Sequence, residues 1–246
     1  MDKALYIAMT SAKNNMLGQA IRSNNLANAN TTGFRSDFEQ ARSMGVYYGE
    51  GLPTRAFALT ETPQTNFAEG ALIQTGRDLD VAVKGRGFIA VQAADGREAY
   101  TRAGSLYVDS AGVLRTGNNL PVMGNAGPMA IPEFQKLEIG LDGIVSIVGK
   151  GEAPDALAQV DQIKLVNPDE ALLKKGADGL LYAEEDVGID VDVSLVSGFL
   201  EGSNVNPVNE LTHILTLARQ YEMSIKLMKT TEENSQASAR LLQTNG

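Results

Sequence analysis

The C-terminal part of the chain carries the clearest periodicity of apolar positions. Alternating steps of three and four residues pass through Leu211, Ile214, Ala218, Tyr221, Ile225, Met228, Glu232, Ser235, Ala239 and Leu242. This heptad spacing predicts a long helix that packs against another helix. Asn206 followed by Pro207 predicts where the helix begins, because Asn can cap free amides and Pro suits the first helical turn.

A shorter and more polar seam lies near the start of the chain. The same spacing runs through Leu5, Met9, Ala12, Met16, Gln19, Ser23 and Leu26. A helix with so thin a seam buries too little apolar area to be stable alone. We therefore expect it to fold only against another helix, either the C-terminal helix of the same chain or that of a neighbour.

The middle of the chain alternates short apolar runs with turn residues, which is typical of β-structure. The Asp-Gly pairs at 95–96, 142–143 and 178–179, with Ala111-Gly112, indicate hairpins. The predicted strands are 79–83, 88–92, 98–102, 105–109, 113–116, 137–139, 144–148, 162–166 and 191–196, and 168–175 is expected to hold one or two helical turns.

These patterns predict an α+β fold with a mainly β central domain and helical ends that pair as a coiled coil on assembly. The expected divisions are an N-terminal helix and motif at 1–35, an extended or partly disordered linker at 36–76, a β-rich domain at 77–203 and a coiled-coil helix at 204–246.

Composition narrows the possible functions. The chain has 246 residues, no Cys, one His and a net charge of -9. Disulfides and thiolate zinc sites are therefore excluded. All of the excess acid lies between residues 36 and 203, which argues against nucleic-acid binding. No apolar run is long enough for membrane insertion, and Lys13 to Asn15 interrupt the only stretch that could serve as a cleaved leader.

The residues that could carry chemistry do not converge on a reaction. His213 falls in the long predicted helix, and no nucleophile elbow accompanies it. Gly85-Arg86-Gly87 lacks the remaining residues of a phosphate loop. The alternating acids, at 78 and 80 and at 190 and 192, could face a cation, but solvated strand faces are the simpler interpretation. We expect no enzyme activity, cofactor or metal.

Three stretches of the sequence resemble the bacterial flagellar axial proteins of the rod and hook. The first is Ser23-Asn-Asn-Leu-Ala-Asn-Ala-Asn-Thr-Thr-Gly-Phe-Arg35, and the last is Leu200-Glu-Gly-Ser-Asn-Val-Asn-Pro-Val-Asn-Glu210 with Ala218-Arg-Gln-Tyr-Glu222. The central stretch, from Gly76 through Phe88 and Tyr100 to Gly104, resembles their β domain. Thr32 stands where many relatives have Pro. The opening residues Met1 to Tyr6, the length and the compact linker are most similar to a proximal-rod protein.

The resemblance implies a structural subunit that polymerises through its terminal helices into the axial shaft of the flagellar basal body. The implied partners are copies of itself, other proximal and distal rod proteins and the flagellar type III export apparatus, and the implied location is the periplasmic part of the basal body. A distal-rod or hook-type protein is the alternative, followed by a β-domain binding module on a coiled-coil stalk. The predicted assembly interface comprises Leu5, Met9, Ala12, Met16, Leu26, Asn28, Gly33, Phe34, Leu211, Ile214, Ala218, Tyr221, Ile225 and Met228.

Overall fold

A computed structural model describes residues 3–39, 41–45, 56–60, 64–151 and 156–244. The chain forms two compact units, each assembled from separate parts of the sequence. The helical unit comprises residues 1–29, 36–66 and 205–246, and the β unit comprises residues 30–35 and 67–204. The residues of the Thr-Gly-Phe-Arg stretch therefore group with the β unit, while most of the predicted linker groups with the helices.

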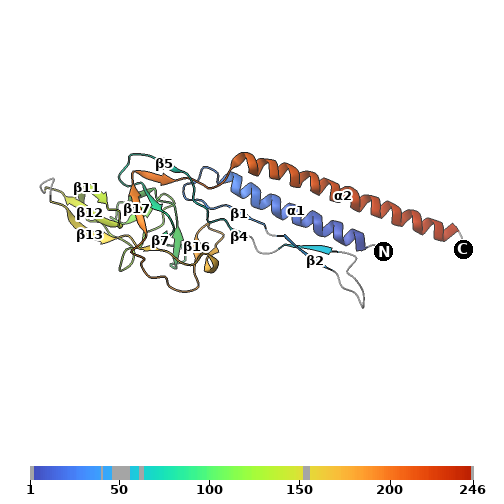
Figure 1. Ribbon diagram of the computed structural model, residues 1–246, viewed down its shortest axis with the longest axis horizontal. Coiled ribbons are helices and arrows are strands. Elements are labelled where there is room, and N and C mark those ends of the chain that lie inside the picture. Colours follow the sequence, from blue (N-terminus) through green and yellow to red (C-terminus); the bar gives the residue numbers. More distant parts are fainter. Residues whose placement is uncertain (1–2, 40, 46–55, 61–63, 152–155, 245–246) are drawn as a thin grey trace. The chain divides into compact units, whose positions relative to one another are not determined.

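Two antiparallel helices dominate the helical unit, α1 (Lys3–Ala27) and α2 (Pro207–Thr244). They lie side by side in Figure 1, and α2 continues past the start of α1. The α2 helix begins at the predicted residue. Asn206 caps it, since its Oδ1 accepts hydrogen bonds from the backbone amides of Val208 at 3.1 Å and Asn209 at 3.2 Å.

Short strands complete the helical unit. β1 (Asp37–Phe38) pairs with β4 (Gln64–Thr65), and β2 (Ala41–Gly45) pairs with β3 (Ala56–Thr60), both antiparallel. The buried Asn25 side chain joins α1 to β1, because it donates to the Asp37 carbonyl at 2.7 Å and accepts from the Asp37 amide at 3.0 Å. The predicted linker is thus extended where it is described, and its residues 40, 46–55 and 61–63 lie outside the described part of the chain.

The β unit is built from antiparallel sheets. The largest has the order β14-β7-β8-β16-β15, made from Leu165–Val166, Phe88–Gln92, Glu98–Thr101, Leu181–Tyr182 and Lys174–Lys175. A second has the order β11-β12-β13, from Phe134–Ile139, Ile144–Gly149 and Ala158–Gln162. Three two-stranded pairs join β9 (Leu106–Val108) to β10 (Leu114–Thr116), β6 (Val81–Lys84) to β17 (Ser194–Ser197) and β5 (Leu72–Gln74) to β18 (Phe199–Glu201).

The predicted hairpins and most of the predicted strands are confirmed. The β11–β12 hairpin turns at Asp142-Gly143, where Gly143 adopts a φ of 82° that side chains other than glycine rarely tolerate. The interval 162–166, predicted as one strand, is divided between β13 and β14. The helical turn predicted in 168–175 is a short 3-10 helix, Glu170–Leu172, followed by β15.

Large aliphatic side chains fill the interior of the β unit. Ile89, Leu106 and Leu114 each expose 0 % of their surface, and they belong to one cluster that all the sheets except the β5–β18 pair supply. A smaller cluster forms around Phe88, Tyr100 and Leu181. Burying side chains of this size contributes about 1.5–3 kcal/mol each, so this unit holds a core of its own.

Candidate functional site

Small and polar side chains make much of the contact between α1 and α2. Arg22 Nη1 lies 3.0 Å from Glu210 Oε1, and Ser224 Oγ lies 3.4 Å from Ser11 Oγ. Ala8 is buried, and Gly18 faces the Leu217 side chain. Small residues let two helices approach closely, but they remove little apolar surface from water. The helical pair within one chain is therefore held by modest forces.

Half of the α2 residues that contact α1 are those predicted, and each of the others is the residue immediately before the predicted one. Ile214, Tyr221 and Met228 are partly covered as predicted, and their neighbours in the observed seam are Glu210, Leu217 and Ser224. The predicted positions Leu211 and Ile225 remain 51 % and 41 % exposed, and Ala218 is half-buried. The reason is steric, because a close approach to Gly18 and Ser11 favours the α2 positions that bring Leu217 and Ser224 inward.

The predicted seam of α1 is displaced in the same way. Met9 and Met16 are 54 % and 56 % exposed, and Leu5 is exposed as well. Ala12 is buried and Leu26 is half-buried. The residues that face α2 instead include Ser11, Gly18 and Arg22.

Several exposed apolar side chains of α2 share one face of the helix, while Met223 and Leu227 are exposed on another. Val208, Leu211, Leu215, Ala218 and Ile225 follow one another at steps of three, four, three and seven residues, so they share a face. We call this face the outer stripe. All of its members except Ala218 are exposed, and Glu222 is the polar residue that interrupts it.

Asn28, Gly33 and Phe34, the predicted interface residues that follow α1, are engaged within their own units. Asn28 Nδ2 donates to the Asn24 carbonyl at 3.0 Å and ends α1. Gly33 has a φ of 69° and donates its amide to the Glu201 carbonyl at 2.8 Å. The Lys175 ammonium lies 4.2 Å from the centre of the Phe34 ring.

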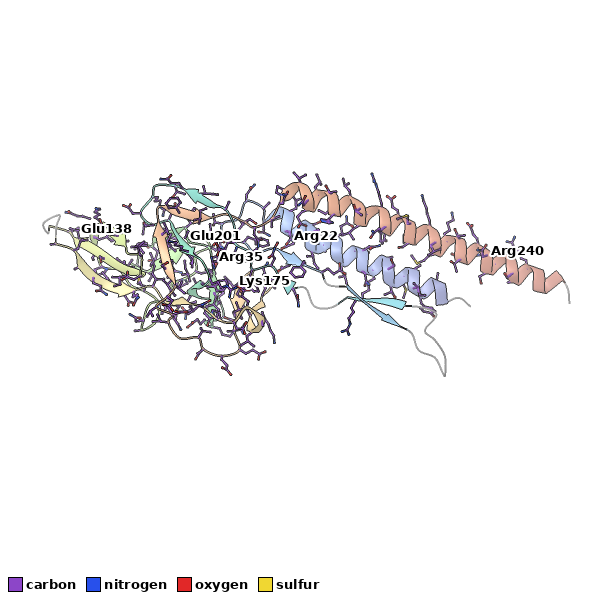
Figure 2. The ribbon with its side chains drawn as sticks, in the orientation of Figure 1. Arg22, Arg35, Glu138, Lys175, Glu201 and Arg240 are labelled. Carbon is purple, nitrogen blue, oxygen red and sulfur yellow. The ribbon has the colours of Figure 1, made fainter. Side chains whose placement is uncertain are left out.

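A buried ion cluster ties these segments together inside the β unit. Glu201 Oε1 lies 2.7 Å from Arg35 Nη2 and accepts a hydrogen bond from the Gly70 amide at 2.8 Å. Glu201 Oε2 accepts from Arg102 Nη1 at 2.9 Å. We call Arg35, Arg102 and Glu201 the Glu201 cluster. Arg35, Glu201 and Lys175 are labelled in Figure 2, and the ion pair joins Arg35 to Glu201.

Burial governs the electrostatics of the cluster. The side chains of Arg35, Arg102 and Glu201 are 3 %, 4 % and 2 % exposed. Loss of solvent lowers the pKa of the Arg35 guanidinium, and the Glu201 carboxylate opposes that change. Removing one partner from such a pair leaves an uncompensated buried charge, which costs about 3–5 kcal/mol. The cluster therefore fixes the segments around residues 35, 70, 102 and 201 to each other.

Sequence reasoning did not identify the Glu201 cluster. Each member nevertheless stands in one of the three stretches that resemble the axial proteins: Arg35 in the first, Arg102 in the second and Glu201 in the third. The signal that could have indicated a pairing is that two of these stretches carry an arginine and the third carries a glutamate. Spacing along the chain could not have indicated it, because the three residues lie on distant segments.

The other candidates offer no reactive geometry. Gly85 accepts a hydrogen bond from Arg102 Nη2 at 2.6 Å through its carbonyl, Asp80 lies 3.4 Å from Arg77 Nη1, and Asp190 accepts from the Asp192 amide at 2.9 Å. His213 is exposed on α2. In the described ranges, no three side chains of the His, Asp or Glu type are grouped as metal ligands would be. No helix among the described residues is long and apolar enough to cross a bilayer.

Three family models match the chain and together span most of it. Residues 5–35 match the flagella basal body rod protein model. Residues 82–147 match the D1 domain of the flagellar hook proteins FlgE, FlgF and FlgG, and residues 196–241 match the C-terminal region of the basal-body rod FlgEFG proteins. The first match contains most of α1 and Arg35, the second contains Arg102, and the third contains Glu201 and most of α2.

Full-length relatives give the same result. The chain is 38 % identical to the flagellar basal-body rod protein FlgF of Escherichia coli strain K12, with 98 % of this chain and 99 % of that protein covered. It is 33 % identical to FlgF of Caulobacter vibrioides, with 98 % of each covered. It is also 32 % identical to the basal-body rod protein FlgG of Bacillus subtilis strain 168, with 95 % and 96 % covered.

Proposed function

The chain belongs to the flagellar basal-body rod protein family, and we propose on that basis that it is a structural subunit of the proximal rod. In this role, copies of the chain and other rod proteins associate through their terminal helices to form the axial shaft. A relative named as the basal-body rod protein FlgF, 38 % identical to this chain, supports a rod subunit, and the resemblance of the opening residues to a proximal-rod protein supports the proximal position.

The observation that carries this proposal is the exposed outer stripe of α2. Leu211, Leu215 and Ile225 remain in contact with water although the chain supplies a second helix that could have covered them. Exposed apolar side chains that line up on one face mark a site of association. Covering each of these side chains in an interface contributes about 1.5–3 kcal/mol, and a polymer repeats that contribution at every subunit.

The apolar residues of α1 support the same role. Leu5, Met9 and Met16 are exposed on a helix whose inward face is small and polar. Met suits surfaces that meet more than one partner, because its unbranched side chain adapts to different neighbours. We propose that these residues, with the half-buried Leu26, belong to the surface that neighbouring rod subunits cover.

The proposed role depends on association rather than on turnover, so we assign the chain no catalytic activity. We also propose, from the family resemblance, that the flagellar type III export apparatus carries the chain to the periplasmic part of the basal body. If so, a strain that lacks a working export apparatus retains the protein inside the cell, which fractionation and immunoblotting can measure.

Ile225→Asp tests the assembly surface. Ile225 is 41 % exposed in the single chain, so the substitution should leave the far-UV circular dichroism and melting temperature of the purified protein nearly unchanged. It should block incorporation into basal bodies and abolish swimming, because an interface would bury an unpaired carboxylate. Gln220→Asp introduces the same carboxylate at an exposed polar position of α2 and should retain motility.

Normal incorporation of Ile225→Asp would refute the proposed role of the outer stripe. A distal-rod position is the second candidate, because a FlgG relative matches 95 % of the chain at 32 % identity. Imaging of purified basal bodies that resolves individual subunits distinguishes the two positions directly.

A further inference from the structure

Strand β5 has an open edge in the β unit. Among the described residues it pairs with β18 alone, and every residue from 71 to 78 is exposed. Leu72 and Ile73 each expose 53 % of their surface. An unpaired strand edge that carries apolar side chains can pair with a strand of another chain.

The ladder between β5 and β18 determines which backbone groups face the open edge. The Ala71 carbonyl accepts from the Gly202 amide at 2.8 Å, and the Thr75 amide donates at 2.9 Å to the residue that precedes β18. Bonds to the partner strand alternate along an antiparallel ladder, so the amides and carbonyls of Leu72 and Gln74 point away from β18. No other described residue forms a backbone hydrogen bond with Leu72 or Gln74.

The opposite edge of this strand pair is already occupied. Glu201 lies across the ladder from Leu72, and its carbonyl accepts from the Gly33 amide at 2.8 Å. The edge of β18 that faces away from β5 is therefore engaged within the chain at this position. A further strand can join the pair only on the β5 side.

The sequence of β5 lacks the features that usually protect an exposed edge. Residues 70–76 are Gly-Ala-Leu-Ile-Gln-Thr-Gly, with no charge and no proline. Natural edge strands commonly carry a charge or a proline, which prevents them from pairing with other chains. The nearest charges flank this neutral segment and have opposite signs, Glu69 before it and Arg77 after it.

The flanking charges favour one way of pairing two copies. An antiparallel pair of identical strands centred on Ile73 brings Glu69 of each copy toward Arg77 of the other, whereas a parallel pair brings like charges together. Glu69 is exposed. The Arg77 side chain is 49 % exposed although its Nη1 lies 3.4 Å from Asp80 Oδ1 and its Nη2 donates to the Leu106 carbonyl. Part of the guanidinium therefore remains accessible to a second carboxylate.

We propose that β5 pairs with β5 of a second copy of this chain, antiparallel and centred on Ile73. In that register, Leu72 and Gln74 exchange backbone hydrogen bonds with Gln74 and Leu72 of the second copy, and the two Ile73 side chains meet across the symmetry axis. A two-fold contact of this kind closes on itself, so it joins two copies and cannot extend a polymer. It is therefore separate from the outer stripe of α2, on which the proposed function depends.

The size of the contact determines how it can be measured. β5 has 3 residues, so the pair buries far less than the roughly 1,200 Å² of stable complexes. We therefore expect a transient association. Covalent trapping detects such a pair better than sedimentation does.

Single cysteines test both the pairing and its register, because the chain has no cysteine of its own. Ile73 and its counterpart form a non-hydrogen-bonded pair, whose Cα atoms lie about 4.5 Å apart, within the range of a disulfide. Ile73→Cys should form a covalent dimer under copper–phenanthroline at least about tenfold faster than Leu72→Cys, because bound thiols react as if within one molecule. Leu72 has the same exposure but faces Gln74 of the second copy.

Two further measurements sharpen the test. Leu141→Cys, at a 70 % exposed position elsewhere in the β unit, reports collisions alone and should also react slowly. A mixture of Leu72→Cys and Gln74→Cys should cross-link faster than either variant by itself, since the proposed register places these two positions opposite each other. All four positions are exposed, so the variants should keep the circular dichroism spectrum of the wild type.

Equal rates for Ile73→Cys, Leu72→Cys and Leu141→Cys would overturn the proposal, and fast reaction of Leu72→Cys would contradict the register. Adding Ile225→Asp separates this contact from the outer stripe. Cross-linking through Ile73→Cys should persist in that double variant, even where incorporation into basal bodies is lost. Loss of cross-linking there would show that association of the helices, and not the β5 edge, brings the two copies together.

Discussion

The two units of this chain differ in the size of the apolar side chains that they bury. In the β unit, Ile89 and Leu106 are wholly enclosed and polar side chains lie mainly outside. In the helical unit, Ala8 and Ser224 are enclosed while Leu211 and Met16 face water. The β unit removes its large apolar side chains from water within a single chain. In the helical unit, contacts with other chains are needed to remove such side chains from water. One chain can therefore contain a unit that buries its large apolar side chains and a second unit that leaves several of them exposed for other chains to cover.

The largest effect should come from breaking the Glu201 cluster. Glu201→Gln removes the carboxylate that pairs with both buried arginines, Arg35 and Arg102, so we expect the β unit to lose about 3–5 kcal/mol of its free energy of unfolding. Urea unfolding followed by circular dichroism measures the change. Glu184→Gln, which removes an exposed partner of Lys174, is the control and should shift the midpoint little. A small change for Glu201→Gln would show that the cluster does not hold the unit together.

Leucine truncation in the two units compares them most directly. Leu106→Ala removes a fully enclosed side chain and should lower the free energy of unfolding by about 2–5 kcal/mol. Leu215→Ala, on the outer stripe, should cost the monomer about 0.5 kcal/mol or less. Incorporation into basal bodies should fall more for Leu215→Ala than for Leu106→Ala, provided that the Leu106→Ala protein folds. A strongly destabilised Leu215→Ala monomer would mean that the stripe is already covered within one chain.

Gly33→Ala addresses the turn that leads into Arg35. Gly33 has a φ of 69°, and an added Cβ would overlap the backbone of Arg102 and Ala103. We expect a loss of about 1–3 kcal/mol in the unfolding free energy of the β unit, because the turn must shift. Gly151→Ala is a suitable control for the backbone strain alone, since its φ is also positive and its Cβ would meet open space. Equal effects of the two substitutions would remove the close approach to Arg102 as the cause.

The smallest effect concerns the start of α2. Asn206→Ala deletes the side chain that accepts from the amides of Val208 and Asn209, and should cost the helical unit about 1 kcal/mol. Amide hydrogen exchange in the first turn of α2 measures this more sensitively than global unfolding. Asn206→Asp retains an acceptor and should restore the protection, so failure of that variant would argue against capping.

Local patterns predicted the elements that depend on neighbouring residues. The strand at 88–92, the turn at Asp142-Gly143 and the start of α2 at Pro207 all follow from short-range backbone preferences. Strands β5 and β18 were not predicted, because each is three residues long and pairs with a segment far away in the sequence. Strand pairing of this kind is decided by the tertiary fold rather than by propensity.

The candidate site divides in the same way. Periodicity identified the apolar faces of both helices, but it could not determine which partner covers each face. Leu217 and Ser224 face α1 because Gly18 and Ser11 admit a close neighbour, and that complementarity is not visible in either seam alone. The contact of Arg35 and Arg102 with Glu201 likewise depends on three segments that are distant in the sequence.

The unequal lengths of the helices have a geometric consequence. Since α2 has 38 residues and α1 has 25, the last turns of α2 extend beyond α1, and no other helix of the described residues lies beside them. If the helices of the next subunit dock on these last turns of α2, the two ends of the polymer differ, and the polymer has a direction of growth. A terminus of such a polymer always presents an unmatched surface, which only a different protein with its own complementary shape can close.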